Sequence, residues 1–490
     1  MATKEQQIRN SFIYLLPTGV GNFIPILTLP IFTRILTKED YGVLALAQVY
    51  AIFVSGLANF GLTTGYERNF FEHKEPKQVS ELLYPTLLFV ITAFIVCAFL
   101  TYIFKSSLSR WIIGSSNHAN LLFWAFCSTG IMGLKNYYLT YFKNMENARA
   151  FAWYTIDESI LGVILSLFMV AYLRIGVIGL VWGQLLASLM IFLILGFKFL
   201  NLHPISFNWA PLKDSLKLSY PLTPRIFLGV IGNQFDKYMI GLINSVGGVG
   251  IYSIGQKVAN FVFTYMTALQ NVFSPQVYRK MFDLGEQGGE AVGRYLTPFL
   301  YVSISLALVI ALFSEEIISI LTPPSFHGAI EIVIILSMFY GSMFFGKQPQ
   351  LIFTKKTYIT SILTVIGITL NIAINIPFIM KWGAIGAAWG TFTAGILSGV
   401  VSFVISQHYY RIHWEYKRLA QIYGIFFIAS LSIILMRYFA IDYLFRFTIK
   451  MMFLTLYIYL GIKMNIISVE NLALVRTLFR PKGRTVLEKN

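Results

Sequence analysis

The sequence has very few cysteines, and both lie in strongly apolar surroundings. Cys97 and Cys127 are the only two in 490 residues, and each falls in a segment long and apolar enough to cross a membrane. A lone cysteine in such a segment usually behaves as a small apolar residue. The sequence therefore predicts no disulfide framework.

Nucleotide-binding and metal-binding motifs are absent as well. The chain has no Walker motif, no glycine-rich dinucleotide loop and no metal-ligand spacing. Motifs therefore argue against ATP-driven pumping by this chain. We expect no catalytic residue, no metal site and no organic cofactor.

Charged residues are scarce, whereas hydrophobic residues are abundant. Asp, Glu, Lys and Arg make up 12% of the chain, hydrophobic residues make up 56%, and the mean hydropathy is +0.67. A water-soluble fold of this length would not tolerate so many apolar side chains on its surface. The connections between apolar segments are short, so no soluble domain of ordinary size fits between them.

Apolar segments of roughly 20 residues, enough to cross about 30 Å of hydrocarbon as a helix, recur along the whole chain. The sequence therefore predicts an all-α polytopic membrane protein with about 14 transmembrane helices. The first segment has no small-residue cleavage site after it, so we expect it to remain as a span. The predicted spans are 9–35, 41–66, 80–104, 119–142, 150–173, 177–200, 214–242, 248–274, 292–312, 328–353, 357–380, 383–407, 419–438 and 443–463.

Most Lys and Arg residues fall on one side of this topology. Because basic residues are retained in the cytoplasm, their distribution predicts that both termini are cytoplasmic. The net charge of +16 is spread over many short loops and the tail, and is not gathered on one soluble face. We therefore expect no nucleic-acid partner.

The second half of the chain repeats the first. Residues 176–183 (GVIGLVWG) match 383–390 (GAIGAAWG) at five of eight positions, with a shift of 207. Two further matches follow in the same order: Gly42 and Gln48 align with Gly250 and Gln256 at a shift of 208, and Lys135, Leu139 and Lys143 align with Lys347, Leu351 and Lys355 at a shift of 212. The repeat predicts two six-helix lobes related by a pseudo-twofold axis along the membrane normal, with a cavity between them.

This repeat sets the expected domain organisation. We expect an N-lobe at 1–205, a C-lobe at 206–410, two further spans at 411–465 and a basic cytoplasmic tail at 466–490. The tail from Ser468 carries apolar residues on one helical side, which predicts an interfacial helix on the anionic inner leaflet.

Residues 30–42 (PIFTRILTKEDYG), followed by a span ending at Gly61-Leu62 and by the residues RNFF at 68–71, resemble the opening of the bacterial polysaccharide-transporter family. That family contains O-antigen and capsule-repeat flippases. It belongs to the superfamily of multidrug and toxin extruders, oligosaccharidyl-lipid flippases and lipid II flippases. The resemblance extends along the chain through the span count, the repeat and the pattern at 176–183. It implies a transporter, not an enzyme, in the bacterial cytoplasmic (inner) membrane.

Four charged residues lie at one predicted depth in the membrane. Lys135, Asp157, Arg225 and Lys347 are each eight residues from a basic boundary residue, and eight helical residues rise about 12 Å. Lys257 falls slightly higher. Charges at this depth are costly unless they face a cavity or a partner, so they are functional candidates by default.

With Glu158 included, this layer has four positive and two negative groups. The surplus of two positive charges fits a pyrophosphate, to which Arg offers bidentate hydrogen bonds and Lys a point charge. We therefore predict that the substrate-binding residues are Arg225, Lys135, Lys347 and Lys257, with Tyr137 and Tyr138 stacking on sugar rings.

A structural interpretation stands beside this one. In it, Asp157 pairs with Lys135 or Arg225, and the remaining lysines extend to the membrane interface. Both interpretations stay open for Lys135 and Lys347. Arg225 is favoured as a ligand because Pro221 and Pro224 interrupt its helix, as happens where spans line cavities.

Acidic residues in the spans suggest ion coupling. Asp157 or Glu158, of which we favour Asp157, is predicted to bind H⁺ or Na⁺, because burial and nearby cations tune a carboxylate. Two other acid–base neighbours, Asp236 with Lys237 and Glu67 with Arg68, are interpreted as an exposed pair at the outer end of a span and as an interfacial pair.

The favoured hypothesis is a flippase that moves an undecaprenyl-pyrophosphate-linked oligosaccharide from the cytoplasmic to the outer leaflet by alternating access, as an ion-coupled antiporter. Its expected partners are this lipid-linked glycan, membrane lipids, and a glycan polymerase with export machinery. A drug or small-metabolite antiporter of the same fold is the alternative, although a cavity for organic cations should be acidic. An intramembrane glycan polymerase is the third hypothesis, and the lack of a large outer loop argues against it.

Overall fold

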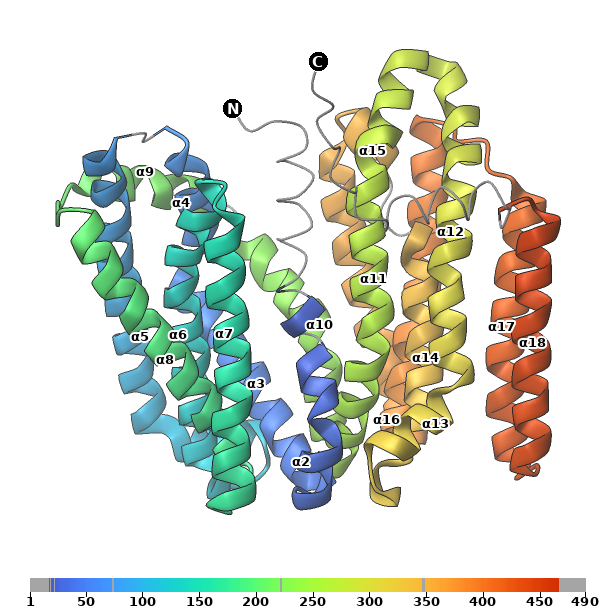
Figure 1. Cartoon of the computed structure of the whole chain (residues 1–490), viewed down its shortest axis with the longest axis horizontal. Coiled ribbons are helices and arrows are strands. Elements are labelled where there is room, and N and C mark those ends of the chain that lie inside the picture. Colours follow the sequence, from blue (N-terminus) through green and yellow to red (C-terminus); the bar gives the residue numbers. More distant parts are fainter. Residues whose placement is uncertain are drawn as a thin grey trace, which may run out of the picture. The chain divides into compact units, whose positions relative to one another are not determined.

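The computed structural model of this chain describes residues 17, 19–21, 23–72, 75–220, 223–345 and 349–466. Within these ranges the secondary structure is helical, without strands, and eight helices are long and apolar enough to cross a membrane (Figure 1). The predicted all-α polytopic fold is confirmed. The predicted tail helix from Ser468 and the predicted ligand Lys347 lie outside the described residues, as do residues 9–16, 18 and 22 of the first predicted span.

Helices occupy nearly all of the predicted spans. Those of the first half are α2 (Leu29–Ile35), α3 (Lys38–Asn59), α4 (Leu62–Phe70), α5 (Pro76–Ile112), α6 (Ala119–Asn144), α7 (Ala148–Leu167) and α8 (Ile178–Leu202). The rest are α9 (Trp209–Ser219), α10 (Thr223–Ile243), α11 (Val246–Leu284), α12 (Gly288–Leu312), α13 (Ser314–Leu321), α14 (Ala329–Ser342), α15 (Pro349–Phe353), α16 (Thr357–Tyr409), α17 (Tyr416–Tyr438) and α18 (Tyr443–Lys463).

The second predicted span, 41–66, is divided between two helices. α3 starts with a capping box, in which Thr37 and Asp40 satisfy each other's backbone N–H groups. It ends at Asn59, where Phe60 and Gly61 adopt left-handed conformations with φ of 46° and 66°, and α4 follows. Figure 1 shows α2 near the end of α3 that is remote from α4.

α16 covers two predicted spans, 357–380 and 383–407, with a break between them. The break is at Gly383, where φ is 58° and ψ is −134°. Only glycine adopts this conformation without strain. A Cβ there would also approach the side chain of Asn244 to 2.9 Å. The break therefore separates the two spans at the position where the repeated motif begins.

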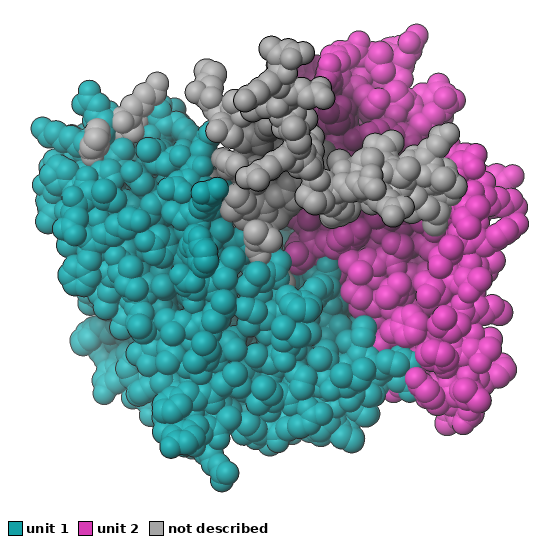
Figure 2. Space-filling view, viewed as in Figure 1, with its two compact units in different colours: residues 1–261, 315–336, 358–398 teal, residues 262–314, 337–357, 399–490 magenta. Residues whose placement is uncertain are grey.

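The helices group into two compact units (Figure 2). Unit 1 contains residues 1–261, 315–336 and 358–398, and unit 2 contains 262–314, 337–357 and 399–490. The boundaries fall inside the helices α11, α13, α14 and α16. Unit 1 thus joins the first half of the chain to parts of the second half. The lobe boundary at 205 and 206, which rests on the repeat, stays a prediction.

Unit 1 is held together by close packing of α6, α7 and α8. Gly183 of α8 lies so close to Ser166 that a Cβ would overlap its backbone. Aromatic rings pack between the C-terminal ends of α6 and α8, where the ring centroids of Tyr141 and Phe199 lie 4.8 Å apart. Small residues at helix contacts are how membrane helices approach without a hydrophobic driving force.

In unit 2, two tyrosines join α18 to α12. The rings of Tyr301 and Tyr457 stack at 4.6 Å with an interplanar angle of 11°. The Tyr301 hydroxyl donates to the Tyr457 carbonyl at 3.0 Å, and the Tyr457 hydroxyl donates to the Tyr301 carbonyl at 2.7 Å. α18, which lies outside the repeat, is therefore an integral part of this unit.

We expect Gly383→Ala to lower the melting temperature of the detergent-solubilised protein, because alanine is strained at this φ and meets Asn244. The expected cost is about 1–3 kcal/mol. Gly399→Ala is the matched control on the same helix, since a Cβ there meets no atom within 4 Å. Equal melting temperatures for the two variants would contradict the assigned strain.

Candidate functional site

A buried carboxylate on α10 joins three helices. Asp236 is 5% exposed. Its oxygen atoms accept hydrogen bonds from the hydroxyl of Thr391 at 2.9 Å, the hydroxyl of Tyr252 at 3.0 Å and the amide of Asn375 at 3.0 Å. Tyr252 lies on α11, and Asn375 and Thr391 lie on the two segments of α16. All of these residues belong to unit 1.

The three donors around Asp236 are electrically neutral. They satisfy the hydrogen-bonding capacity of the carboxylate without an ion pair, so that only the more distant charge of Lys237 partly offsets its own, and such a charge is costly at membrane depth. The side-chain oxygen Oδ1 of Asn375 is buried beside it and has no hydrogen-bond partner among the residues that the structure describes. Asn371, one turn earlier, donates to the same Thr391 hydroxyl at 3.4 Å. The cluster thus gathers oxygen atoms around one negative charge, as a small cation or a proton requires.

The prediction that Asp236 and Lys237 form an exposed pair at the outer end of a span is wrong. Asp236 points into the protein, whereas the ammonium group of Lys237 donates to Gln234 at 3.2 Å. Adjacent residues on a helix point about 100° apart, so the two side chains face different neighbours. The partners of Asp236 on α16 follow it by 139 and 155 residues, and the local sequence of α10 does not reveal them.

The predicted substrate-binding lysine Lys257 lies close to this cluster on α11. Its side chain is exposed, and its ammonium group stands 5.5 Å from the centre of the Tyr41 ring. Its charge also interacts with that of Lys237. Among the ion pairs formed by described residues, neither lysine takes part. Lys237 also interacts with the opposite charge of Asp236, so Lys257 is the cation of this group that lacks an acidic partner among the described ion pairs.

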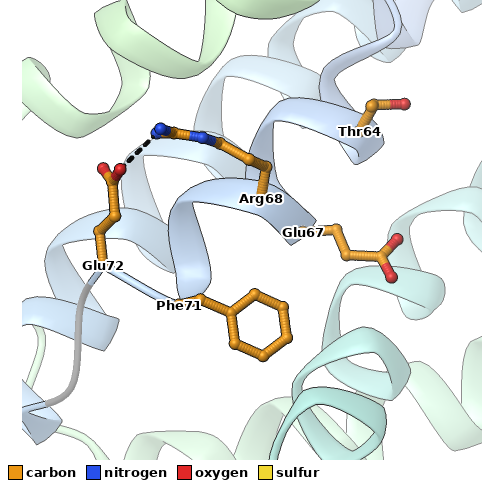
Figure 3. Close-up of a pocket in the computed structure, with 5 residues that line it drawn as sticks. All are labelled: Thr64, Glu67, Arg68, Phe71 and Glu72. Atoms are coloured by element: carbon orange, nitrogen blue, oxygen red, sulfur yellow. Dashed lines mark ion pairs between the residues drawn. The ribbon is translucent and has the colours of Figure 1, made fainter. Parts of the chain in front are cut away.

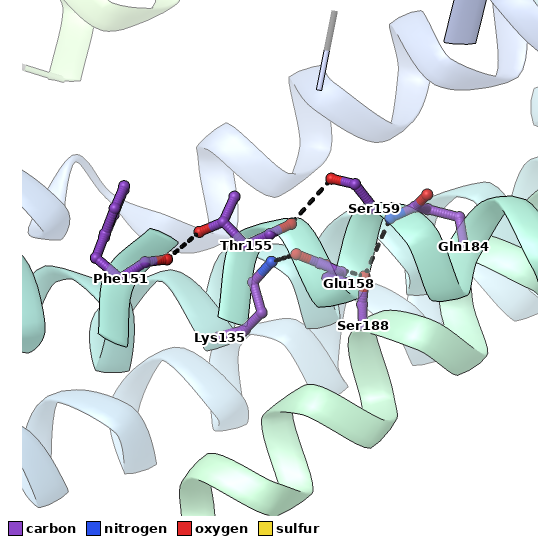
Figure 4. Close-up of polar contacts among 7 residues, drawn as sticks. All are labelled: Lys135, Phe151, Thr155, Glu158, Ser159, Gln184 and Ser188. Atoms are coloured by element: carbon purple, nitrogen blue, oxygen red, sulfur yellow. Dashed lines mark hydrogen bonds and ion pairs between the residues drawn. The ribbon is translucent and has the colours of Figure 1, made fainter. Parts of the chain in front are cut away.

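A second buried network crosses α6, α7 and α8 (Figure 4). Lys135 and Glu158, which are 2% and 4% exposed, form an ion pair. The other carboxylate oxygen of Glu158 accepts a hydrogen bond from Ser188 at 2.6 Å. Gln184, one turn before Ser188, donates to the serine hydroxyl at 3.5 Å. This network cancels its own charge, unlike the cluster around Asp236.

This network corrects the structural interpretation of Lys135. Its partner is Glu158, not Asp157, and its side chain is too deeply buried to extend to the interface. Asp157 is exposed, because the 100° step per residue turns it away from α6 when Glu158 faces that helix. The predicted ion-coupling roles of Asp157 and Glu158 stay predictions.

Tyr137 and Tyr138 lie inside the helix packing. Tyr137 is 1% exposed, donates a hydrogen bond to Asn59, and packs edge to face on Tyr66 at 5.3 Å. Tyr138 is 6% exposed and lies 4.7 Å from the ring of Phe199. Neither ring offers an open face to a sugar in this conformation, and their predicted stacking role stays untested.

Two predicted substrate ligands are not placed by the structure. Arg225 belongs to α10, but its side chain lies outside the described part, and Lys347 falls between the described ranges. Their predicted roles stay predictions.

Glu67 and Arg68 do not form the predicted pair. Glu67 forms an ion pair with Lys143 at 2.7 Å, whereas Arg68 reaches Glu72, one turn later on the chain, at 2.7 Å. Figure 3 shows the two side chains directed apart around a hollow lined by Thr64, Glu67, Arg68, Phe71 and Glu72. These pairs are half exposed, and such pairs contribute little stability.

The residues missed at the sequence level are Tyr252, Asn375 and Thr391. One signal was available for Asn375: together with Asn371 it places two amides four residues apart, on one face of an otherwise apolar span. Thr391 directly follows the repeated motif at 383–390. No local pattern marks Tyr252 among the many aromatic residues of the spans.

Known proteins resemble this chain in sequence. A family model described as "Polysaccharide biosynthesis protein" matches residues 8–276. The putative O-antigen transporter of Escherichia coli K12 is 21% identical over 406 residues, which cover 79% of this chain and 94% of that protein. The probable low-salt glycan biosynthesis flippase Agl15 of Haloferax volcanii is 27% identical over 188 residues, which cover 36% of this chain and only 39% of that protein.

Solved structures share the fold. The lipid II flippase MurJ in an inward closed conformation superposes with a TM-score of 0.69 at 17% identity, covering 96% of this chain and 100% of that one. An inward-facing multidrug resistance transporter of the MATE family superposes with a TM-score of 0.61 at 12% identity, covering 81% and 97%. At these identities the likeness concerns the fold alone, and it confirms the predicted polytopic architecture.

The buried ion pair generates a prediction for stability. Lys135→Met should destabilise the protein by about 3–5 kcal/mol, because it leaves the Glu158 charge buried and uncompensated. Lys135→Met combined with Glu158→Gln should recover most of that loss. Thermal unfolding in detergent measures both, with Asp157→Asn as an exposed control that should unfold like the wild type. If the double variant is no more stable than Lys135→Met, the two side chains are not coupled as proposed.

Proposed function

The chain belongs to the polysaccharide biosynthesis protein family, and we propose on this basis that it is a flippase for an undecaprenyl-pyrophosphate-linked oligosaccharide. It is a multi-pass membrane protein of a transporter fold, and not an enzyme. The substrate would pass from the cytoplasmic to the outer leaflet of a bacterial cytoplasmic membrane by alternating access of the two repeats. Both termini would face the cytoplasm.

The placement of Lys257 is the observation that carries this proposal. Its exposed ammonium group lies near the like charge of Lys237, with no acidic partner among the described ion pairs. A lysine charge at membrane depth without an acidic partner is costly until an anion joins it. A pyrophosphate supplies that anion while its lipid tail stays in the bilayer. Arg225 on α10 is a further proposed ligand for the same group.

Ion coupling forms the second part of the proposal. The coupling ion, H⁺ or Na⁺, would bind at Asp236, which accepts hydrogen bonds from neutral donors and takes part in none of the ion pairs of the described residues. Asn375 Oδ1 and the hydroxyl oxygen of Thr391 complete an oxygen-rich environment, since a hydroxyl group can rotate to present its lone pairs. Glu158 suits this role less well, because Lys135 and Ser188 already engage it.

An antiporter for drugs or small metabolites remains the competing function for this fold. The composition of lipid extracts from depleted cells distinguishes the two functions. Cells depleted of the flippase would accumulate the isoprenoid-pyrophosphate oligosaccharide, whereas cells depleted of a small-molecule antiporter would not.

We expect Lys257→Gln and Arg225→Gln to reduce flipping at least about tenfold, because each removes a cationic ligand of the pyrophosphate. Mass spectrometry of lipid extracts from depleted cells carrying each variant measures the build-up of the lipid-linked glycan. Lys213→Gln, on the exposed face of α9, is the charge-matched control. Cells that carry it should accumulate no more lipid-linked glycan than cells that carry the wild-type protein. A wild-type level of lipid-linked glycan in cells that carry Lys257→Gln would contradict the proposed pyrophosphate site.

Asp236→Asn should abolish the response of the purified protein to its coupling ion. A Na⁺ site raises the melting temperature in NaCl relative to choline chloride at equal ionic strength, because a ligand of the native state stabilises it. A proton site instead changes the melting temperature with pH. Asp214→Asn, at an exposed carboxylate of α9, is the control and should keep the wild-type response. An unchanged response in Asp236→Asn would refute the assignment.

A further inference from the structure

α3 and α11 begin at the same end of unit 1, where their backbones touch. A Cβ at Gly42 of α3 would overlap the carbonyl oxygen of Val246, the first residue of α11. A Cβ at Gly250 of α11 would overlap the carbonyl oxygen of Lys38, the first residue of α3. Each helix therefore leaves room for the first turn of the other, and neither glycine can gain a side chain without moving the helices apart.

The internal repeat relates the contact of Gly42 with Val246 to the contact of Gly250 with Lys38. A shift of 208 residues carries Gly42 onto Gly250 and also carries Lys38 onto Val246 (250 − 42 = 246 − 38 = 208). The contact therefore maps onto itself when the halves are exchanged, which places it on the pseudo-twofold axis. A contact on this axis is the one place where both halves meet through the same residues.

Neighbouring residues extend this contact between the halves. Thr33 of α2 donates to the carbonyl oxygen of Leu321 on α13 at 3.1 Å. The ring of Tyr41 meets that of Phe326 edge to face at 5.6 Å. Thr33, Tyr41 and Phe326 are at most 3% exposed. Small residues, aromatic rings and a satisfied hydroxyl thus leave a dry junction at this end.

We propose that the reciprocal contact of Gly42 and Gly250 is the outer closure of the transport path, which α3 and α11 must break to release substrate. The inference rests on the proposed transport function and on the predicted topology, which places Arg34 and Lys38 on the outer side. To the proposed function it adds the residues that close the path on the outer side: Gly42 of the first half against Val246, and Gly250 of the second half against Lys38.

Tyr252 connects this closure to the candidate ion site. It follows Gly250 by two residues on α11, it is fully buried, and its hydroxyl donates to Asp236 at 3.0 Å. A charged carboxylate accepts a stronger hydrogen bond than one neutralised by a proton or shared with a cation. The state of Asp236 therefore biases the position of the first turns of α11. Tyr252 is a positioning residue in this proposal.

Thiol labelling from the outside tests the seal. The reporter is Ser253→Cys, a near-isosteric change at a buried position three residues after Gly250, in a background of Cys97→Ala and Cys127→Ala. Gly42→Ala and Gly250→Ala should each raise the labelling rate by a membrane-impermeant maleimide about tenfold, because the added Cβ separates the helices. Gly56→Ala on α3, where a Cβ meets nothing within 4 Å, should not change it. Equal rates in all three variants would overturn the seal.

Tyr252→Phe tests the connection to Asp236. It keeps the ring and removes only the hydroxyl group. The labelling rate of Ser253→Cys should depend on the coupling ion in the parent protein and become independent of it in Tyr252→Phe. The ion-induced shift in melting temperature, which reports binding at Asp236, should persist. A full ion response of labelling in Tyr252→Phe would refute the connection.

Reversible cross-linking covers the case in which the glycine variants do not fold. Cysteines at Tyr41 and Phe326, joined by a short reducible bis-thiosulfonate reagent, should block labelling of Ser253→Cys until the cross-link is reduced. Each single cysteine variant, treated in the same way, should show unchanged labelling. Continued labelling of the cross-linked protein would overturn the closure. Because labelling requires no substrate, its outcome is independent of whether lipid-linked glycan accumulates in depleted cells.

Discussion

A hydrocarbon layer offers no water to a buried polar group, so each such group must find its partners within the protein. This constraint shapes both polar networks of unit 1. In the first, Lys135 and Glu158 neutralise each other and Ser188 takes the remaining carboxylate oxygen. In the second, three neutral donors surround Asp236. The same requirement explains why the helices run almost without interruption and why left-handed residues occur at their junctions.

The two networks show where the repeat holds and where it fails. The halves share backbone contacts at glycines, such as Gly42 and Gly250, and they share the motif at 176–183 and 383–390. Their buried carboxylates differ, because Glu158 in the first half forms an ion pair with Lys135, whereas Asp236 in the second half accepts hydrogen bonds from neutral donors. The repeated framework therefore carries a different polar network in each half.

Composition and hydropathy were sufficient to predict the fold, because the length of an apolar segment reports directly on the thickness of a bilayer. The repeat was likewise visible in the sequence. The partners of the charged residues were not. Whether Asp157 or Glu158 faces α6, and whether Asp236 points inward, depends on the rotation of each helix about its axis, and a rotation of 100° exchanges the two outcomes. Contacts between Asp236 and α16 span more than a hundred residues, and only tertiary packing reveals them.

The stacked tyrosines of α12 and α18 have a consequence for the surrounding lipid. With rings 4.6 Å apart and both hydroxyl groups bonded across the contact, no acyl chain fits between the two helices at that level. A lipid tail that accompanies a polar head group through the protein must therefore enter and leave the bilayer through another crevice. At the level of Tyr301 and Tyr457, a lipid therefore cannot enter unit 2 from the bilayer between α12 and α18.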